Sequence, residues 1–448
     1  MGSSALLLAL AGCSSDDDSG GGGTLDGGGM PDANVDTGGG SAEGGDAGAI
    51  TANRPELVPA TDDRIATLKV PEGFELSVFA RNLVGARMLA AGPDRSVYVT
   101  LPMTSQVLRL IDENSDGDTD DANERTVVAS VADSPHLAGV HGITIAGTSV
   151  YLASVNSLFN ATLANGQFAG LREIAADLPD GGQHPNRTLA VGPDGKLYVS
   201  VGSDCNACAE SDTEHATLLR FELDGRASSN PPQPAHPVLA HVPTTMMSSR
   251  IFASGLRNTL GFDWHPNTGE LWGSDHGSDG LGDDLPPDEL NRLTAGASYG
   301  WPYCGGDRQP DPTVDQPSMM LTKEAYCPET QPLVLPYPAH SAPIAFLFYR
   351  GTQFPADYAG DAFVAFRGSW NRAVATGYKI VRVHFENGVP APRAGNASAI
   401  EDFVTGFLLD NDHQFGRVAG LAVDPDGSLL VSEDSNGVIY RIAYTAPR

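Results

Sequence analysis

The amino-acid sequence predicts an all-β fold, a six-bladed β-propeller preceded by a disordered N-terminal tether. One observation is a unit of two short strand-like runs around a tight turn, which recurs six times along the chain. A second is the turn-rich composition, with 52 glycines and 32 prolines among 448 residues, which favours short strands over long helices. A third is that residues 64–448 contain no long apolar stripe with helical spacing.

Each copy of the repeat consists of a small apolar run, a Pro-Asp-Gly turn or a variant of it, and a β-branched or aromatic run. This alternation is typical of two half-buried strands joined by a tight turn. The copies span 89–100, 143–154, 189–202, 261–275 and 421–434, and a weaker copy consists of 344–351 and 361–370. Six such hairpins fit propeller blades with insertions and exceed the usual two-sheet sandwich, the alternative all-β fold. We expect the last strand, 439–445, to close the ring against a strand from 74–80.

The N-terminus predicts export and lipidation. Residues 6–11 form a short apolar run, and the sequence LAGC at 10–13 resembles a bacterial lipobox, whose cysteine is acylated. We therefore expect a lipoprotein signal peptide over 1–13, lipidation at Cys13, and a location in the periplasm or on the cell surface. A truncated secretion signal is the alternative. No later segment has the roughly 18 uncharged apolar residues that a membrane-spanning helix needs.

Residues 14–63 are predicted to be a flexible linker. Positions 14–50 contain eight acidic residues, no Lys or Arg, and many glycines. Such a segment cannot bury enough apolar surface to offset the entropy of ordering it, and its charges repel one another. The linker would hold the propeller domain, predicted over 64–448, away from a membrane surface.

The chain is strongly acidic, with a formal net charge of −29 from 27 basic and 56 acidic residues. A surface of this charge repels nucleic acids and anionic lipids, so nucleic acid is excluded as a partner and membrane contact is expected only through the lipid anchor. Arginines are scarce on such a chain, which makes a local cluster of them informative.

The four cysteines after Cys13 suit an exported protein. An even number of cysteines in an oxidising compartment predicts two disulfides. Adjacency in the sequence favours Cys205–Cys208 and Cys304–Cys327. The alternative for the CNAC motif is a redox pair or half of a zinc site, but a second CxxC or a nearby set of Cys and His partners is missing.

The residues just before the Pro-Asp-Gly hairpins should reach the central depression of a propeller. They include His184, Arg257, Asn258 and Arg417, while Arg367 occupies the strand-end position of another blade. One histidine and three arginines would then converge on one face, where arginine forks suit an anionic ligand. The alternative is that each of these side chains caps a loop or pairs with a neighbouring carboxylate.

An ordered set of motifs carries a resemblance to a known family. The motifs are HPNRTLAVGPDGKLYVSVG, GLRNTLGFDWHPNTGELW, GDDLPPDELN, YGWPYC, RGSWNR and PDGSLLVS. In this order they resemble the pyrroloquinoline-quinone (PQQ) sugar dehydrogenases, in the sorbosone and pyranose dehydrogenase branch related to soluble glucose dehydrogenase. The resemblance covers nearly all of 64–446. It implies a PQQ- and calcium-dependent oxidation of an aldose or related sugar or alcohol, with an external electron acceptor because no CxxCH haem motif is present.

The resemblance also assigns roles to the candidate residues. Arg257, Arg367 and Arg417 would contact PQQ, which carries three carboxylates, and Asn258 would hydrogen-bond a quinone oxygen. His184 would be the general base that takes the proton from the sugar hydroxyl.

The same resemblance places a calcium ion beside the quinone. The backbone carbonyls of Gly277 and Ser278 would hold this ion, since calcium prefers hard oxygen ligands and can act as a Lewis acid. Trp301 and Trp370 are either stacking surfaces for sugar or buried anchors.

Several positions depart from the family pattern and leave the substrate open. Arg367 stands where the sorbosone branch often has histidine, and Ala419 stands where the glucose branch has a second arginine. His276 replaces a glutamine before the calcium loop, and His141 aligns with a sugar-holding glutamine. Two alternatives therefore remain: a lactonase-type propeller hydrolase with a metal on side-chain carboxylates at the channel centre, and a non-catalytic sugar-binding propeller.

A second calcium site is predicted in the acidic loop after residue 111. Asp112, Asn114, Asp116 and Asp118 follow a D-x-N-x-DG spacing, with a glycine at the sharp turn. Position twelve of the loop is Asn123 where a glutamate would give the strongest binding. The alternative is a solvated acidic loop without an ion.

Overall fold

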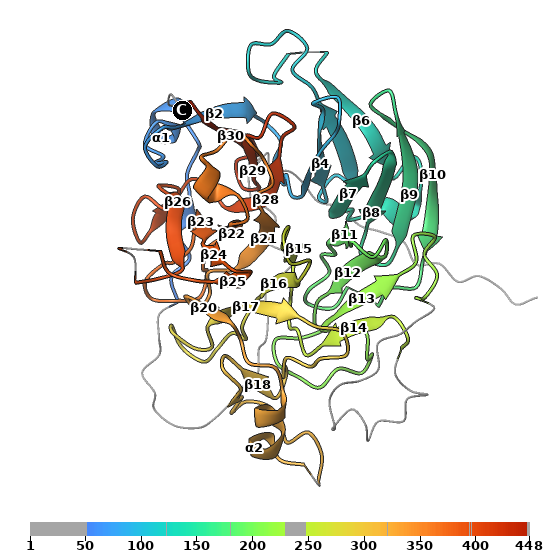
Figure 1. The fold of residues 1–448 in the computed structure, drawn as a ribbon, viewed down its shortest axis with the longest axis vertical. Helices are drawn as coiled ribbons and strands as arrows, with labels where there is room; N and C mark the ends of the chain where they lie inside the picture. The colour runs from blue at the N-terminus through green and yellow to red at the C-terminus, as the bar shows by residue number, and fades with distance from the viewer. Residues whose placement is uncertain are drawn as a thin grey trace, which may run out of the picture.

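The computed structural model of the chain describes residues 52–445, apart from 122, 180, 229–247, 320, 394 and 396. Six four-stranded antiparallel sheets are arranged in a ring (Figure 1). The predicted six-bladed β-propeller is therefore confirmed. The inner strands of neighbouring blades contact one another around the ring axis.

The first three blades follow one another along the chain. Blade one consists of β3 (Leu89–Ala91), β4 (Val97–Leu101), β5 (Gln106–Leu110) and β6 (Arg125–Ser130). Blade two consists of β7 (Gly142–Ala146), β8 (Ser149–Ala153), β9 (Leu158–Ala164) and β10 (Gln167–Ala175). Blade three consists of β11 (Leu189–Val191), β12 (Leu197–Val201), β13 (Thr217–Phe221) and β14 (Ile251–Ser254).

The other three blades complete the ring. Blade four consists of β15 (Gly261–Trp264), β16 (Leu271–Asp275), β17 (Asp288–Leu293) and β20 (Leu335–Tyr337). Blade five consists of β21 (Pro343–Phe348), β22 (Ala362–Phe366), β23 (Lys379–Val383) and β26 (Ile400–Val404). Blade six consists of β28 (Val418–Val423), β29 (Leu429–Glu433), β30 (Val438–Tyr444) and β2 (Phe74–Ala80).

Each predicted repeat copy forms the first two strands of one blade, and in blades one, three and six these strands are joined by a Pro-Asp-Gly turn or its Pro-Asp-Arg variant. In blade three, the Gly192 amide donates to the Lys196 carbonyl over 2.8 Å, and Asp194 Oδ1 accepts from the Lys196 amide over 3.1 Å. Gly195 adopts φ +70°, a left-handed conformation that costs glycine little. Arg95 takes that place in blade one with φ +64°. The turn chemistry therefore explains why the motif recurs.

The ring closes with strands from both ends of the propeller. β2 pairs with β30 in antiparallel register, from Phe74 opposite Tyr444 to Ala80 opposite Ile439, as predicted. The N-terminal strand thus becomes the outer strand of a blade whose other three strands come last in the sequence. This pairing covers an edge that would otherwise expose free backbone groups.

Large apolar side chains fill the space between neighbouring blades. Trp272 of β16 is fully buried and lies in one cluster with Phe348 and Phe366 of blade five. Its ring meets that of Phe385 edge-on, with centroids 5.2 Å apart. Such burial between blades is the main source of stability in this architecture.

Regular structure against the propeller is already present before residue 64, the predicted start of the domain. β1 (Glu56–Leu57) pairs in parallel with β27 (His413–Gln414), and α1 (Asp62–Ile65) follows, capped by Thr61. Residues 52–63 therefore lie against the propeller, in contrast to the linker expected up to 63. Cys13, the signal peptide and most of the linker lie outside the described residues.

The remaining elements are short. Two further strand pairs are β18 (Cys304–Gly305) with β19 (Gln309–Pro310) and β24 (Phe385–Glu386) with β25 (Val389–Pro390). The helical elements are α2 (Lys323–Tyr326) and the 3-10 turns η1 (Pro135–Leu137), η4 (Cys327–Glu329) and η5 (Ala356–Tyr358). Over the described ranges, every helix is too short or too polar to cross a bilayer.

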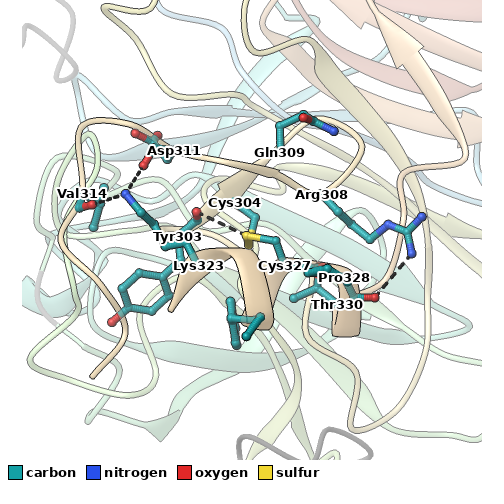
Figure 2. Close-up of a disulfide and its surroundings, with 12 residues drawn as sticks. Tyr303, Cys304, Arg308, Gln309, Asp311, Val314, Lys323, Cys327, Pro328 and Thr330 are labelled. Atoms are coloured by element: carbon teal, nitrogen blue, oxygen red, sulfur yellow. Dashed lines mark hydrogen bonds between the residues drawn. A yellow bond between two sulfur atoms is a disulfide. The ribbon is translucent and has the colours of Figure 1, made fainter. Parts of the chain in front are cut away.

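Both predicted disulfides are confirmed. Cys205 bonds Cys208, and Cys304 bonds Cys327 in the insertion that carries β18, β19 and α2 (Figure 2). Figure 1 shows this insertion projecting from the ring beside blade four. Lys323 supports it by donating hydrogen bonds to two backbone carbonyls of the same insertion.

Candidate active site

The predicted base and the three predicted cofactor-binding arginines line one cavity. His184, Arg257, Arg367 and Arg417 all contribute to a cavity of about 240 Å³. They come from different parts of the ring: His184 precedes β11, Arg257 lies between β14 and β15, Arg367 follows β22, and Arg417 precedes β28. The positions chosen from the repeats therefore converge.

Buried carboxyl groups fix the backbone that carries two of these arginines. Asp275, the last residue of β16, accepts hydrogen bonds from the amides of Arg257 (3.0 Å) and Asn258 (2.8 Å). Glu433, the last residue of β29, accepts from the amide of Arg417 over 3.0 Å. In both blades, a buried carboxyl at the end of the second strand thus accepts a hydrogen bond from the backbone amide of the arginine that precedes the first strand.

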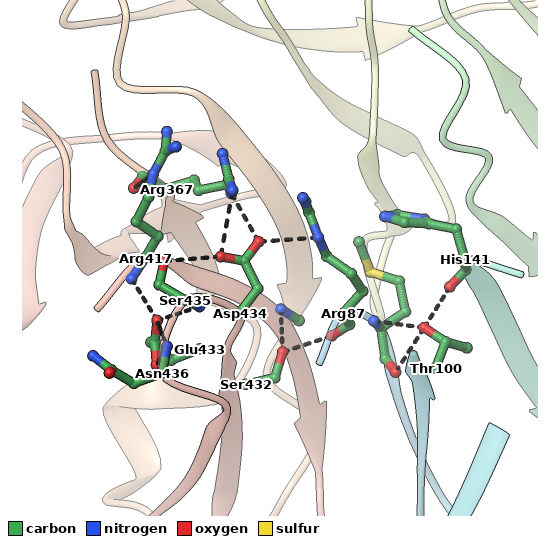
Figure 3. A network of polar contacts seen from close by, with 12 residues as sticks. Arg87, Thr100, His141, Arg367, Arg417, Ser432, Glu433, Asp434, Ser435 and Asn436 are labelled. Atoms are coloured by element: carbon green, nitrogen blue, oxygen red, sulfur yellow. Dashed lines mark hydrogen bonds and ion pairs between the residues drawn. The ribbon is translucent and has the colours of Figure 1, made fainter. Parts of the chain in front are cut away.

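A shared buried aspartate holds Arg367 and a further arginine, Arg87 (Figure 3). Asp434 Oδ2 lies 2.9 Å from Arg367 Nε and 3.0 Å from Arg87 Nε. Burial alone would raise the pKa of Asp434, but the two guanidinium groups outweigh it and lower that pKa. Arg417 Nη2 donates to the Gly368 carbonyl over 2.7 Å, which ties it to the loop that follows Arg367. The arginines are therefore positioned by internal partners.

The cavity has more positive than negative groups. In the part of the chain that the structure describes, five arginines and two carboxyl groups line it. One of these, Asp288, has its pKa raised to about 7 by burial, so it is only partly ionised near neutrality. The other, Asp279, is held ionised because His340 and Arg257 outweigh its burial and lower its pKa to about 2. A cationic cavity on a chain of net charge −29 suits an anionic ligand.

His184 is held as a neutral imidazole. Its Nδ1 lies 2.9 Å from the Ser203 carbonyl oxygen, which can only accept, so Nδ1 carries the hydrogen and Nε2 the lone pair. Burial, with Arg257 as the next cause, lowers its pKa well below 6.5. His184 is only 4% exposed. The side chain therefore has the tautomer and the protonation state of a base.

A glycine makes room for this histidine. A Cβ added to Gly202 would lie 2.4 Å from Cβ of His184 and 2.8 Å from Oδ1 of Asn258. Both approaches are shorter than real side chains allow, so the end of β12 needs glycine for steric reasons. Asn258 itself is buried, with Nδ2 3.4 Å from Nδ1 of His276, and is not among the residues that line the cavity.

Of the two residues predicted to hold calcium beside the quinone, one lines the cavity and the other does not. Gly277 lines the cavity, and its amide donates to Asp288 Oδ1 over 2.9 Å. Ser278 is buried without lining the cavity. Within the ranges that the structure covers, no three His, Cys, Asp or Glu side chains gather as metal ligands. Calcium binding through these two carbonyls stays a prediction.

The acidic loop between β5 and β6 is held by its own side chains. Asp112 accepts from the amides of Ser115 (2.6 Å) and Gly117 (3.1 Å). Asn114 and Asp116 each accept from the amide two residues further on, over 2.9 and 3.2 Å. Asp118 does the same toward the amide of residue 120 over 2.9 Å. The structural calcium stays a prediction, and this loop does not line the cavity.

The departures from the family pattern fall partly inside the cavity. His276 lines it, and burial together with Arg257 lowers the pKa of His276 to about 4. His141 and Ala419 are buried elsewhere. Trp370 lines the cavity, whereas Trp301 is a buried anchor.

Sequence reasoning missed many of the residues that line the cavity. They include Arg54, Arg87, Asp279, His340 and Asn371. Arg87 had a signal, because it stands two residues before the first strand of the first repeat copy. The others lie outside the repeats, where no periodicity assigns a position.

Glu433 gives a testable pH dependence of stability. Burial, followed by the neighbouring charge of Asp434, raises the pKa of Glu433 to about 7. A raised pKa means that the folded state binds the extra proton, so stability is full below about pH 4.5 and is lost as pH rises through 7. We expect the wild type to lose about 2 kcal/mol from this group between about pH 5 and 8. In Glu433→Gln this part of the decrease in unfolding free energy with rising pH should disappear.

Denaturant unfolding at several pH values measures this effect. The exposed Glu72→Gln is the matched control and should keep the wild-type slope. An unchanged slope in Glu433→Gln would show that the buried carboxyl does not take up a proton.

Comparison with known proteins finds one matching family model and several related sequences. The family model described as TrAA12-like matches residues 68–445. The chain is 26% identical over 287 residues to quinoprotein glucose dehydrogenase B of Acinetobacter calcoaceticus, covering 56% of each chain. It is 24% identical over 348 residues to the pyrroloquinoline quinone-dependent sugar dehydrogenase of Hypocrea jecorina, covering 68% of this chain and 74% of the relative.

A solved structure shares the fold. It is the calcium structure of a Trichoderma reesei carbohydrate-active enzyme of family AA12, with a TM-score of 0.68 at 20% identity. The match covers 88% of this chain and 99% of that one. Arg54 precedes the residues that the family model matches, so the cavity includes one arginine from outside the matched region.

Proposed function

The chain belongs to the TrAA12-like family, and from this premise we propose that it is a PQQ- and calcium-dependent dehydrogenase of an aldose or related sugar or alcohol. The observation that carries the proposal is the convergence of His184, Arg257, Arg367 and Arg417 on one cationic cavity. Two relatives are named as a quinoprotein and a PQQ-dependent sugar dehydrogenase, which supports the same chemistry.

The side chains of the cavity fit PQQ. The cofactor carries three carboxylates, and charged guanidinium donors in a partly desolvated cavity bind such groups strongly. Arg257, Arg367 and Arg417 would hold it. Asn371 Oδ1 is a buried acceptor without a partner among the described residues, although its residue lines the cavity. That atom would accept a hydrogen bond from a hydroxyl of the sugar.

Calcium and Asn258 have less direct support. The backbone carbonyls of Gly277 and Ser278 are of the ligand type that calcium prefers, and a calcium-containing relative shares the fold. The ion at Asp112, Asn114, Asp116 and Asp118 would be structural. Asn258 would have to reach the quinone from behind the cavity wall.

When bound, PQQ would supply the two-electron acceptor that takes up the hydride of the sugar. The protein's own residues supply the proton chemistry and the orientation. His184 Nε2 would accept the proton of the sugar hydroxyl, while the Nδ1 hydrogen bond to Ser203 keeps the ring in that tautomer. Arg257 favours the neutral imidazole beforehand, because its positive charge opposes protonation.

We also propose export and lipid anchoring through Cys13. The two disulfides support an oxidising compartment. A periplasmic or cell-surface enzyme of this kind would pass its electrons to an external acceptor. The lactonase alternative lacks support, because the described residues offer no cluster of carboxylate or histidine metal ligands.

Reconstitution tests the proposed function. Purified protein is mixed with PQQ and calcium, and dye reduction is followed with a panel of aldoses and lactones. Dye reduction by aldoses that requires PQQ is the expected result. Lactone hydrolysis without PQQ would support the hydrolase, and sugar binding without turnover would support the non-catalytic propeller.

A further inference from the structure

The loop Ser203–Cys208, which contains the Cys205–Cys208 disulfide and is here called the CNAC loop, contacts both His184 and Arg257. On the basis of the proposed function, we propose that this loop positions the base His184 and the cofactor-binding Arg257, with Asn206 as the positioning residue for Arg257. The loop does not line the cavity, so its action is through these two side chains.

Asn206 binds one side of the Arg257 guanidinium. Arg257 Nε donates to the Asn206 backbone carbonyl over 2.9 Å, and Arg257 Nη2 donates to Asn206 Oδ1 over 2.8 Å. In the described part of the chain, Nη1 has no hydrogen-bond partner. The asparagine therefore fixes the fork in a defined plane and leaves one amino group for a ligand.

Asn206 also joins blade three to blade four. Its Nδ2 donates to the Asp279 carbonyl over 2.9 Å, and its Oδ1 accepts from the Asp279 amide over 2.8 Å. The Asp279 carboxylate then accepts from Arg257 Nη2 over 3.1 Å. One amide side chain thus aligns Arg257 with its partly buried counter-ion.

The start of the CNAC loop orients His184. Ser203 presents both its carbonyl oxygen and its hydroxyl to His184 Nδ1, at 2.9 and 2.8 Å. The hydroxyl donates to the Cys205 carbonyl over 2.7 Å, so it faces the histidine with its lone pairs. The Cys205–Cys208 bond closes the loop that contains both the Cys205 carbonyl and Asn206. Opening the disulfide should loosen both contacts together.

Two sets of substitutions distinguish a positioning role from a contribution to folding stability alone. Asn206→Ala removes one hydrogen bond from a charged donor and should weaken PQQ binding about ten-fold. Because no residue that touches substrate changes, kcat at saturating PQQ and KM for sugar should stay within about two-fold of wild type. A merely structural role would lower the melting temperature and leave the PQQ affinity unchanged.

The double variant Cys205→Ser/Cys208→Ser tests the loop as a whole. It should weaken PQQ binding at least as much as Asn206→Ala does. Chemical reduction of the disulfides in the wild type should also weaken PQQ binding. The matched control is Cys304→Ser/Cys327→Ser, which opens the other disulfide, in an insertion that does not line the cavity. This control should lower stability without changing the PQQ affinity.

The readout is calorimetric titration of PQQ into the full chain with calcium present, together with thermal unfolding. A wild type that does not bind PQQ would overturn the proposed function and this inference with it. If the wild type binds PQQ and the Asn206 and Cys205/Cys208 variants bind it with the same affinity, this inference alone is overturned.

Discussion

Replacing His184 with alanine is expected to lower turnover of the PQQ-loaded protein by about 10²- to 10⁴-fold, the usual contribution of a general base. The side chain is buried at the cavity, its Nδ1 is committed to Ser203, and Nε2 is left to accept a proton. Among the described residues, the two other histidines that line the cavity cannot replace it in the same way. His276 Nε2 donates to the Pro343 carbonyl over 3.0 Å, and His340 Nε2 donates to the Gly282 carbonyl over 2.8 Å.

Steady-state dye reduction and PQQ titration together measure this effect. PQQ should still bind the variant, because the proposed carboxylate contacts come from the arginines. His136→Ala is the control, since His136 is an exposed surface residue paired with Glu173. Turnover that survives in His184→Ala would mean that another group takes the proton.

Replacing Arg367 with alanine is expected to weaken PQQ binding about 10²-fold or more, or about 3 kcal/mol. The substitution removes a cation that lines the cavity and frees one partner of the buried Asp434. The aspartate would then contribute more negative charge to a site that has to bind an anion. The PQQ affinity of Arg367→Lys should lie between those of the wild type and Arg367→Ala, because a lysine ammonium keeps the positive charge but lacks the planar guanidinium fork.

The control for this substitution is Arg350→Ala. Arg350 also pairs with an aspartate, Asp263, but its side chain is 47% exposed and lies away from the cavity. Circular dichroism confirms that each variant is folded before PQQ is titrated. Equal PQQ affinity of Arg367→Ala and wild type would remove Arg367 from the binding site.

Most of the fold could be predicted from the sequence because the turn chemistry repeats. Each Pro-Asp-Gly segment or variant turn forms a hairpin on local grounds, and six repeats of paired strands leave few architectures open. The start of the domain could not be predicted in this way. β1 is only two residues long, and both Glu56 and Leu57 are exposed. Its order comes from pairing with β27, more than 350 residues further along the chain.

The site was predictable where it follows the repeats. Arg257 and Arg417 each precede the first strand of a blade, and the same rule would have found Arg87. Asp279 and His340 belong to irregular loops, where the spacing of residues in the sequence does not indicate where a side chain points. The partners that hold the arginines, such as Asn206, are also set by contacts between blades rather than by local sequence.

The central claim is that scarce arginines gather at one cavity to bind a polyanionic quinone. Titration of PQQ into the calcium-loaded full chain at increasing salt concentration tests it most directly. The account predicts saturable one-to-one binding that weakens as salt screens the charges, and that weakens further in Arg257→Ala, Arg367→Ala and Arg417→Ala. Absence of saturable binding, or an affinity that none of the three substitutions changes, would contradict it.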